Sequence, residues 1–268
     1  MTSSNPSMTA GSCTLVGAGP GDPELLTLKA VKAIQAATVL FVDDLVNHEI
    51  LAWARPGARI VHVGKRGGCK STPQAFIEKL MITAVREGEH VVRLKGGDPF
   101  IFGRGGEEVE HLREAGIECR VVNGITAGLA AVTALGVPLT HRDHAQGVVF
   151  VTGHAKAGER ARHDATDWRQ LAAATRDARL TLVVYMGVAG AAHIRASLLE
   201  GGLPASTPVA VVQHATLPHQ QQLLSTLGAL DHDLAASGLG SPSVIVVGDV
   251  LLGVQALAQP APARDFGT

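Results

Sequence analysis

Aromatic residues and cysteines are scarce in this chain of 268 residues. Phe, Trp and Tyr together make up 3% of it, so the core must be built from Ala, Val, Leu and Ile, and few side chains could stack on nucleic-acid bases. The cysteines are Cys13, Cys69 and Cys119, an odd and isolated set. This pattern excludes a disulfide framework and a CxxC motif, and it suits a reducing cytoplasm.

An excess of positive charge and a long hydrophobic run are also lacking. Lys and Arg number 23 against 24 Asp and Glu, a net charge of −1, whereas a general nucleic-acid binder is usually basic. The most apolar late stretch, residues 244–258, is interrupted by Asp249 and is too short to cross a bilayer. Residues 1–12 lack the basic start and apolar segment of a signal peptide. We expect a cytoplasmic protein that binds neither nucleic acid nor membrane.

Short β-branched runs alternate with stretches of helical spacing along most of the chain, which is typical of an α/β fold with largely parallel sheets. In the first helical stretch Asp22 is placed to cap a helix that has Pro23 at its first position. The expected strands are residues 13–16, 38–42, 59–63, 90–94, 119–122, 148–152, 180–185, 208–213 and 243–247.

The glycine-containing segment 123–128 follows an apolar strand near the middle of the chain and is interpreted as a hinge between two lobes. Residues 155–179, rich in Ala, Arg and Asp, are interpreted as a variable surface insertion. The predicted organisation is a disordered tail (1–12), an N-terminal α/β lobe (13–123), a C-terminal α/β lobe (124–258) and a frayed tail (259–268).

The first glycine-rich loop, residues 17–23, only partly matches the dinucleotide fingerprint GxGxxG. Asp22 occupies the place of the third glycine, and Pro20 has no N–H to offer a pyrophosphate. An acidic residue at a helix N-terminus also repels phosphate. The loop therefore favours a cofactor that is not a phosphate ester.

The second glycine-rich loop follows the strand at residues 90–94. Gly96 and Gly97 would let a ligand lie on bare backbone, and Asp98 could accept a hydrogen bond from it. Arg104 and Glu107 are spaced to share one helix face, either as a surface ion pair or as part of a site.

The segments GAGPGDPELLTLKA, VGKR, RLKGGDPFIFGRGGEE, NGITAG, PLTHRD, VVYMG and AVVQHATLP occur in this order over residues 13–255. Together they resemble the tetrapyrrole methylase superfamily, and within it the enzymes that methylate C2 and C7 of uroporphyrinogen III to give precorrin-2 for sirohaem and cobalamin synthesis. The resemblance implies two α/β lobes with S-adenosyl-L-methionine in the cleft between them, S-adenosyl-L-homocysteine as product, no metal, and a homodimer.

The resemblance also implies roles for individual residues. The proton acceptor would be Asp43, next to Asp44, and the proton donor would be Lys65. At one cofactor contact the family commonly has glycine where this chain has Ala215. The implied cofactor contacts are Pro20, Gly96, Gly97, Asp98, Ile101, Thr126, Ala127, Met186 and Ala215.

Eight carboxylates on this substrate would require local positive charge, for which Arg66, Arg104 and Arg142 are the candidates. After methyl transfer the tetrapyrrole must lose a proton, and either Asp43 or Glu107, beside Arg104, could accept it.

Other functions remain open beside this one: methylation of a later cobalamin precursor, methylation of RNA or a translation factor, and nucleotide binding without catalysis. His141, His144 and His154 match no metal-ligand framework and are better suited to hydrogen bonding.

Overall fold

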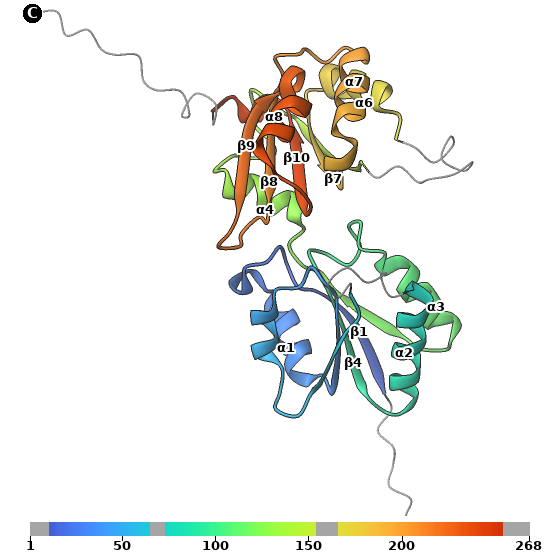
Figure 1. Cartoon of the computed structure of the whole chain (residues 1–268). Coiled ribbons are helices and arrows are strands. Elements are labelled where there is room, and N and C mark those ends of the chain that lie inside the picture. The colour runs from blue at the N-terminus through green and yellow to red at the C-terminus, as the bar shows by residue number, and fades with distance from the viewer. Residues whose placement is uncertain (1–10, 65–72, 154–165, 254–268) are drawn as a thin grey trace, which may run out of the picture. The chain divides into compact units, whose positions relative to one another are not determined.

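The computed structural model describes residues 11–64, 73–153 and 166–253 (Figure 1). The chain forms two compact units, residues 1–127 (unit 1) and 128–268 (unit 2). The boundary proposed from the sequence, between residues 123 and 124, lies in the connection from strand β5 (Cys119–Val122) to helix α4 (Ala127–Ala134).

Unit 1 contains a five-stranded sheet whose paired strands are all parallel, in the order β3-β2-β4-β1-β5. Helices cover both faces of this sheet, and the inner strands β1, β2 and β4 are accordingly almost completely buried. The strands are β1 (Ser12–Gly17), β2 (Val39–Val42), β3 (Arg59–His62), β4 (His90–Lys95) and β5 (Cys119–Val122).

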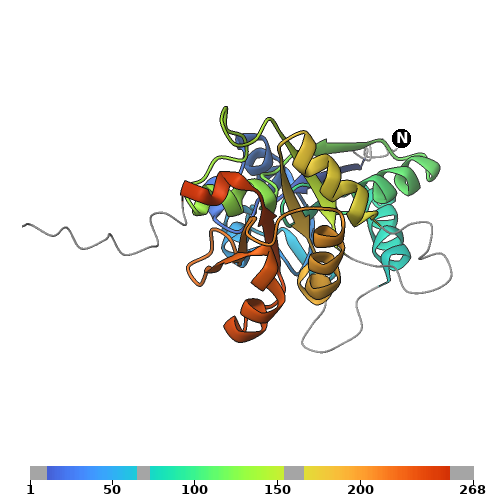
Figure 2. The same ribbon diagram turned by 90° about the horizontal axis from the view of Figure 1, so that it is seen from above.

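Helix α1 (Leu28–Ala36) covers one face of this sheet, while α2 (Gln74–Arg86) and α3 (Gly105–Glu114) lie side by side on the other (Figures 1 and 2). The capping prediction at Asp22 needs correction. Asp22 caps only the short 3-10 turn η1 (Pro23–Leu25), and the hydroxyl of Thr27 caps α1 separately by accepting from the Ala30 N–H. A second 3-10 segment, η2 (His48–Trp53), follows β2.

Unit 2 has a mixed sheet in the order β6-β7-β10-β8-β9. Only β6 and β7 pair in parallel, and the other pairings are antiparallel, so the expectation of largely parallel sheets is wrong for this unit. Strand β9 was not expected from the sequence, whereas the other nine described strands are confirmed. The strands are β6 (Gly147–Thr152), β7 (Leu180–Tyr185), β8 (Pro208–Gln213), β9 (Gln221–Thr226) and β10 (Ser243–Val247).

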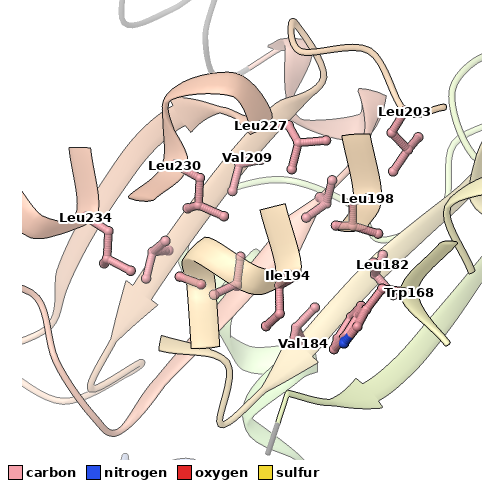
Figure 3. Close-up of a cluster of buried hydrophobic side chains, with 14 of the residues drawn as sticks. Trp168, Leu182, Val184, Ile194, Leu198, Leu203, Val209, Leu227, Leu230 and Leu234 are labelled. Carbon is pink, nitrogen blue, oxygen red and sulfur yellow. The ribbon is translucent and has the colours of Figure 1, made fainter. Parts of the chain in front are cut away.

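Three helices of unit 2, α6 (Trp168–Asp177), α7 (Ala191–Glu200) and α8 (Leu230–Ser237), share one hydrophobic core with the sheet. In Figure 3 the side chains of Ile194 and Leu198 on α7 lie beside Val184 and Leu182 on β7. Helix α4 (Ala127–Ala134) packs on the opposite face, where the Gly128 N–H donates to the Tyr185 hydroxyl at 2.8 Å. The 3-10 segments are η3 (Val188–Gly190), η4 (Leu227–Ala229) and η5 (Asp249–Leu251).

The interpretation of residues 155–179 as a surface insertion is wrong for its described part. Trp168, Ala172 and Thr175 of α6 are buried, and the Trp168 ring lies next to the β7 residues in Figure 3. The Ala-rich composition reflects a helix that packs closely against its neighbours. Within the described residues, no helix is both long and apolar enough to span a membrane.

Candidate active site

The two glycine-rich loops of unit 1 leave adjacent strands and diverge. Strands β1 and β4 are paired at the centre of the sheet; the loop after β1 leads to α1, and the loop after β4 leads to α3 on the opposite face. In open α/β sheets, ligands commonly bind outside the carboxyl ends of the strands at the point where neighbouring connections lead to opposite faces. Mutual backbone hydrogen bonds between Gly19 and Gly97, at 2.7 and 3.2 Å, join the two loops.

Glycine is required where the loop after β5 meets these two. A Cβ on Gly124 would lie 2.2 Å from the Gly97 carbonyl oxygen, and one on Gly17 would lie 2.4 Å from the Gly124 nitrogen. Backbone atoms cannot give way to such contacts. Thr126 and Ala127 also adjoin Gly97, since a Cβ there would lie 3.7 Å from both residues.

Asp98 holds these loops together. Its Oδ1 accepts from the Phe100 N–H at 2.8 Å, and its Oδ2 accepts from Asn123 Nδ2 and the Gly124 N–H, both at 3.1 Å. The carboxylate is buried, and these donors belong to the protein. These contacts of Asp98 shape the loop backbone around Gly96 and Gly97, and its expected contact with a ligand stays a prediction.

The loop between β4 and α3 exposes apolar side chains from a strained backbone. Phe102 and Arg104 have left-handed φ angles of 52° and 59°. Non-glycine residues in that region cost about 1–3 kcal/mol each and concentrate at ligand sites. Phe100 and Ile101 are exposed on the same loop, and Leu45 is exposed on the loop after β2. This edge of unit 1 therefore presents apolar surface beside bare backbone.

Arg104 and Glu107 lie on one side of the helix start, as expected, and they form the surface ion pair that was one of the two interpretations of their spacing. Arg104 Nε donates to both carboxylate oxygens of Glu107, at 3.0 and 3.2 Å, and both side chains are exposed. The hydrogen bond from Arg104 is the main cause of the lowered pKa of Glu107. A lowered pKa makes this carboxylate a weak proton acceptor at neutral pH.

Asp43, directly after β2, contacts a buried ionic network that was not expected from the sequence. Its Oδ2 lies 3.6 Å from Nη2 of Arg93, and the side chain of Arg93 is 2% exposed. Glu108, fully buried, contacts Arg93 Nε and Lys95 Nζ at 3.1 Å each. Burial, and then the charge of Arg93, lower the pKa of Lys95.

A signal for this network is present in the sequence. Arg93 and Lys95 alternate with apolar residues in the segment VVRLK, so strand periodicity places both cations on one face of the sheet. Cations on a strand that is covered by helices must be paired with buried carboxylates or other hydrogen-bond acceptors.

In unit 2, Met186 and Ala215 follow β7 and β8, which run in the same direction because both are antiparallel to β10 between them. Both residues thus lie at the same end of that sheet, where β7 and β8 terminate. Met186 has φ 53° and is exposed; Ala215 is buried between His214 and Thr216, whose φ angles are 52° and 70°. The left-handed strain therefore falls on the neighbours of Ala215, and alanine is tolerated there.

The other predicted residues are placed as follows. Pro20 lies in the loop after β1, and Arg142 is exposed in a turn closed by the hydrogen bond from the His141 N–H to the Ala145 carbonyl. Lys65, Arg66 and His154 lie outside the described residues. Within residues 11–64, 73–153 and 166–253, no group of three or more His, Cys, Asp or Glu side chains could hold a metal ion.

Known proteins are similar to this chain in sequence and in fold. The sequence profile of the Tetrapyrrole (Corrin/Porphyrin) Methylases matches residues 12–231. The chain belongs to this family. A uroporphyrinogen-III C-methyltransferase from Pseudomonas aeruginosa is 54% identical over 90% of this chain and 94% of its own length. Siroheme synthase 2 from Aeromonas hydrophila is 47% identical over 96% of this chain but only 53% of its own.

Among solved structures, the uroporphyrin-III C-methyltransferase of Thermus thermophilus complexed with S-adenosylhomocysteine is similar to this chain. Its TM-score is 0.73 at 38% identity, over 91% of this chain and 100% of that one.

The family's cofactor suits the residues of unit 1. Asp22 Oδ1 already accepts the Glu24 N–H at 2.8 Å, which leaves an acidic turn and not a phosphate site after β1. S-adenosylmethionine carries no phosphate; its adenosyl part needs apolar surface and backbone contacts. Ile101 and the Gly96–Gly97 backbone would offer these.

Proposed function

We propose that this protein is an S-adenosylmethionine-dependent methyltransferase that methylates C2 and C7 of uroporphyrinogen III to give precorrin-2, for sirohaem or cobalamin synthesis. The observation that carries the proposal is the 54% identity, over nearly the whole of both chains, with the P. aeruginosa enzyme. The proposal includes action in the cytoplasm and as a homodimer, with no nucleic acid or membrane partner.

When bound, S-adenosylmethionine supplies a sulfonium methyl group as the electrophile. We propose that Pro20, the 96–98 loop, Ile101, Thr126 and Ala127 hold it in unit 1, and Met186 and Ala215 in unit 2. In each transfer a bond forms between the methyl carbon and a pyrrole carbon while the sulfur–methyl bond breaks, and the tetrapyrrole then releases a proton. Most of the rate acceleration comes from holding the reacting atoms in line.

Positive side chains would orient the carboxylates of the tetrapyrrole. Arg104 and Arg142 are both exposed. Arg66 is proposed to act with them because it is a positive side chain in the segment VGKR, which resembles the family. An arginine can bind a carboxylate through two parallel hydrogen bonds, which fixes its orientation as well as its charge.

Asp43 is the better candidate for accepting the released proton. One of its oxygens, Oδ1, accepts from the Asp44 N–H at 3.1 Å, but its side chain stays 35% exposed at the end of β2. Glu107 accepts hydrogen bonds from Arg104 at 3.0 and 3.2 Å, which lower its pKa, whereas Asp43 lies farther from its arginine, 3.6 Å from Nη2 of Arg93. Lys65 is proposed as the proton donor from the family resemblance.

Anaerobic incubation of the purified protein with S-adenosylmethionine and uroporphyrinogen III, followed by mass analysis, tests the function. A gain of two methyl groups is the expected result. Cofactor binding without methylation would instead move the function to another member of the family. Sedimentation of the purified chain tests the homodimer.

A further inference from the structure

The buried cations Arg93 and Lys95 share one buried carboxylate, and Asp43 lies close enough to be a second counter-charge for this cluster. Arg93 and Lys95 are buried cations, and in the described part of the chain the fully buried carboxylate in contact with both is that of Glu108. A buried charge without a counter-charge is costly. The Asp43 carboxylate, 3.6 Å from Arg93, supplies the second negative charge.

The Arg93 guanidinium is fixed from several directions. Its Nε contacts Glu108 Oε1 at 3.1 Å, and its Nη1 donates to the carbonyls of Phe41 at 3.5 Å and Leu94 at 3.2 Å. Because the guanidinium is a rigid plane, these bonds also direct Nη2, the nitrogen that faces Asp43.

Glu108 is itself held in place, which extends the support to two helices. Gln74 Nε2 of α2 donates to Glu108 Oε1 at 2.8 Å, and Glu108 lies in the first turns of α3. Strand β4 and helices α2 and α3 thus determine together where the Arg93 cation sits.

We propose that Arg93 is a positioning residue that orients the Asp43 carboxylate for accepting the proton released by the tetrapyrrole. The side chain of Arg93 is 2% exposed, so it acts through Asp43 and does not touch the substrate. This inference rests on the proposed function and on the proposed role of Asp43.

The test compares Arg93→Met in two backgrounds, with Asp43 intact and with Asp43→Asn. Met fills much of the volume of the arginine stem. It also leaves Lys95 paired with Glu108, so that no unbalanced charge remains buried with them. Single-turnover methylation of uroporphyrinogen III gives the rate of the chemical step, and steady-state kinetics separate kcat from KM.

With Asp43 intact, we expect Arg93→Met to lower kcat about 30-fold, within the range for a misplaced catalytic group, while KM changes less than threefold. In the Asp43→Asn background the same substitution should change the rate less than twofold, because the carboxylate it positions is gone. Arg93→Lys keeps the positive charge but lacks the planar guanidinium with its several N–H donors, and it should give an intermediate kcat.

Two results would overturn the inference: an unchanged kcat in Arg93→Met, or an equal loss in both backgrounds. If Arg93→Met does not fold, Arg93→Lys takes its place in the same comparison with the same two criteria. If Asp43→Asn is too slow to measure, Asp43→Glu serves as the second background.

Controls separate failure of this inference from failure of its premises. Arg120→Met, on the exposed side of β5, should leave kcat unchanged, and calorimetric binding of S-adenosylhomocysteine verifies that each variant is folded. A wild-type protein that does not methylate uroporphyrinogen III would overturn the proposed function. Full activity in Asp43→Asn would overturn only the role of Asp43 and, with it, that of Arg93.

Discussion

Replacing Glu108 by Gln probes the buried network most directly, because it removes the charge and keeps the shape. Glu108 is fully buried and contacts the side chains of Arg93 and Lys95 at 3.1 Å each. Breaking a buried ion pair by removing one partner costs about 3–5 kcal/mol. Against a total stability of about 5–15 kcal/mol, this loss is large.

The loss should depend on pH. Burial and Arg93 already lower the pKa of Lys95, and loss of the Glu108 charge lowers it further. Between the folded pKa and the unfolded value of about 10.4, the unfolded chain binds more protons than the folded one, so stability rises with pH. We therefore expect the deficit of Glu108→Gln to shrink between pH 7 and pH 9.

Urea unfolding followed by circular dichroism at both pH values measures this. Glu110→Gln, an exposed carboxylate on the same helix, is the matched control and should change stability by less than about 0.5 kcal/mol. The variant Glu108→Gln/Lys95→Met should recover part of the loss, because it removes one cation as well. A deficit below about 1 kcal/mol at pH 7, or one unchanged by pH, would refute the reasoning.

Three further outcomes are expected. Gly124→Ala should lower the melting temperature and weaken S-adenosylhomocysteine binding measured by calorimetry, since its Cβ would lie 2.2 Å from the Gly97 carbonyl oxygen. Trp168→Ala should cost about 3–5 kcal/mol in urea unfolding, because the ring is buried in the core of unit 2; a surface insertion would lose almost nothing. Glu78 raises the pKa of His111, so this pair should stabilise the fold fully below about pH 6.5, the unfolded pKa of histidine, and less as the pH rises through the folded pKa. The variant His111→Asn should therefore lose this pH dependence when unfolding is measured at pH 5.5 and at pH 8.5.

Local patterns determined most of the elements and the family. Nine described strands follow from runs rich in β-branched residues, which are favoured in strands. Strand β9, with the sequence QQLLST, lacks that pattern because it is a sheet edge with exposed and half-covered positions. Helix α6 was misread because composition alone does not separate a packed Ala-rich helix from a surface segment.

The spacing of three residues at a helix start was enough to place Arg104 and Glu107 on one side and to offer their ion pair as one interpretation, because such contacts are local. The partners of Asp43 are not local. Only the parallel pairing of β2 with β4, which puts Phe41 opposite Arg93, brings that guanidinium to the end of β2. Only the packing of α3 places Glu108 between Arg93 and Lys95. The sequence by itself determined which charges lie on β4 and α3, and the tertiary structure decided which carboxylate each one meets, because those contacts join strands and helices far apart in the chain.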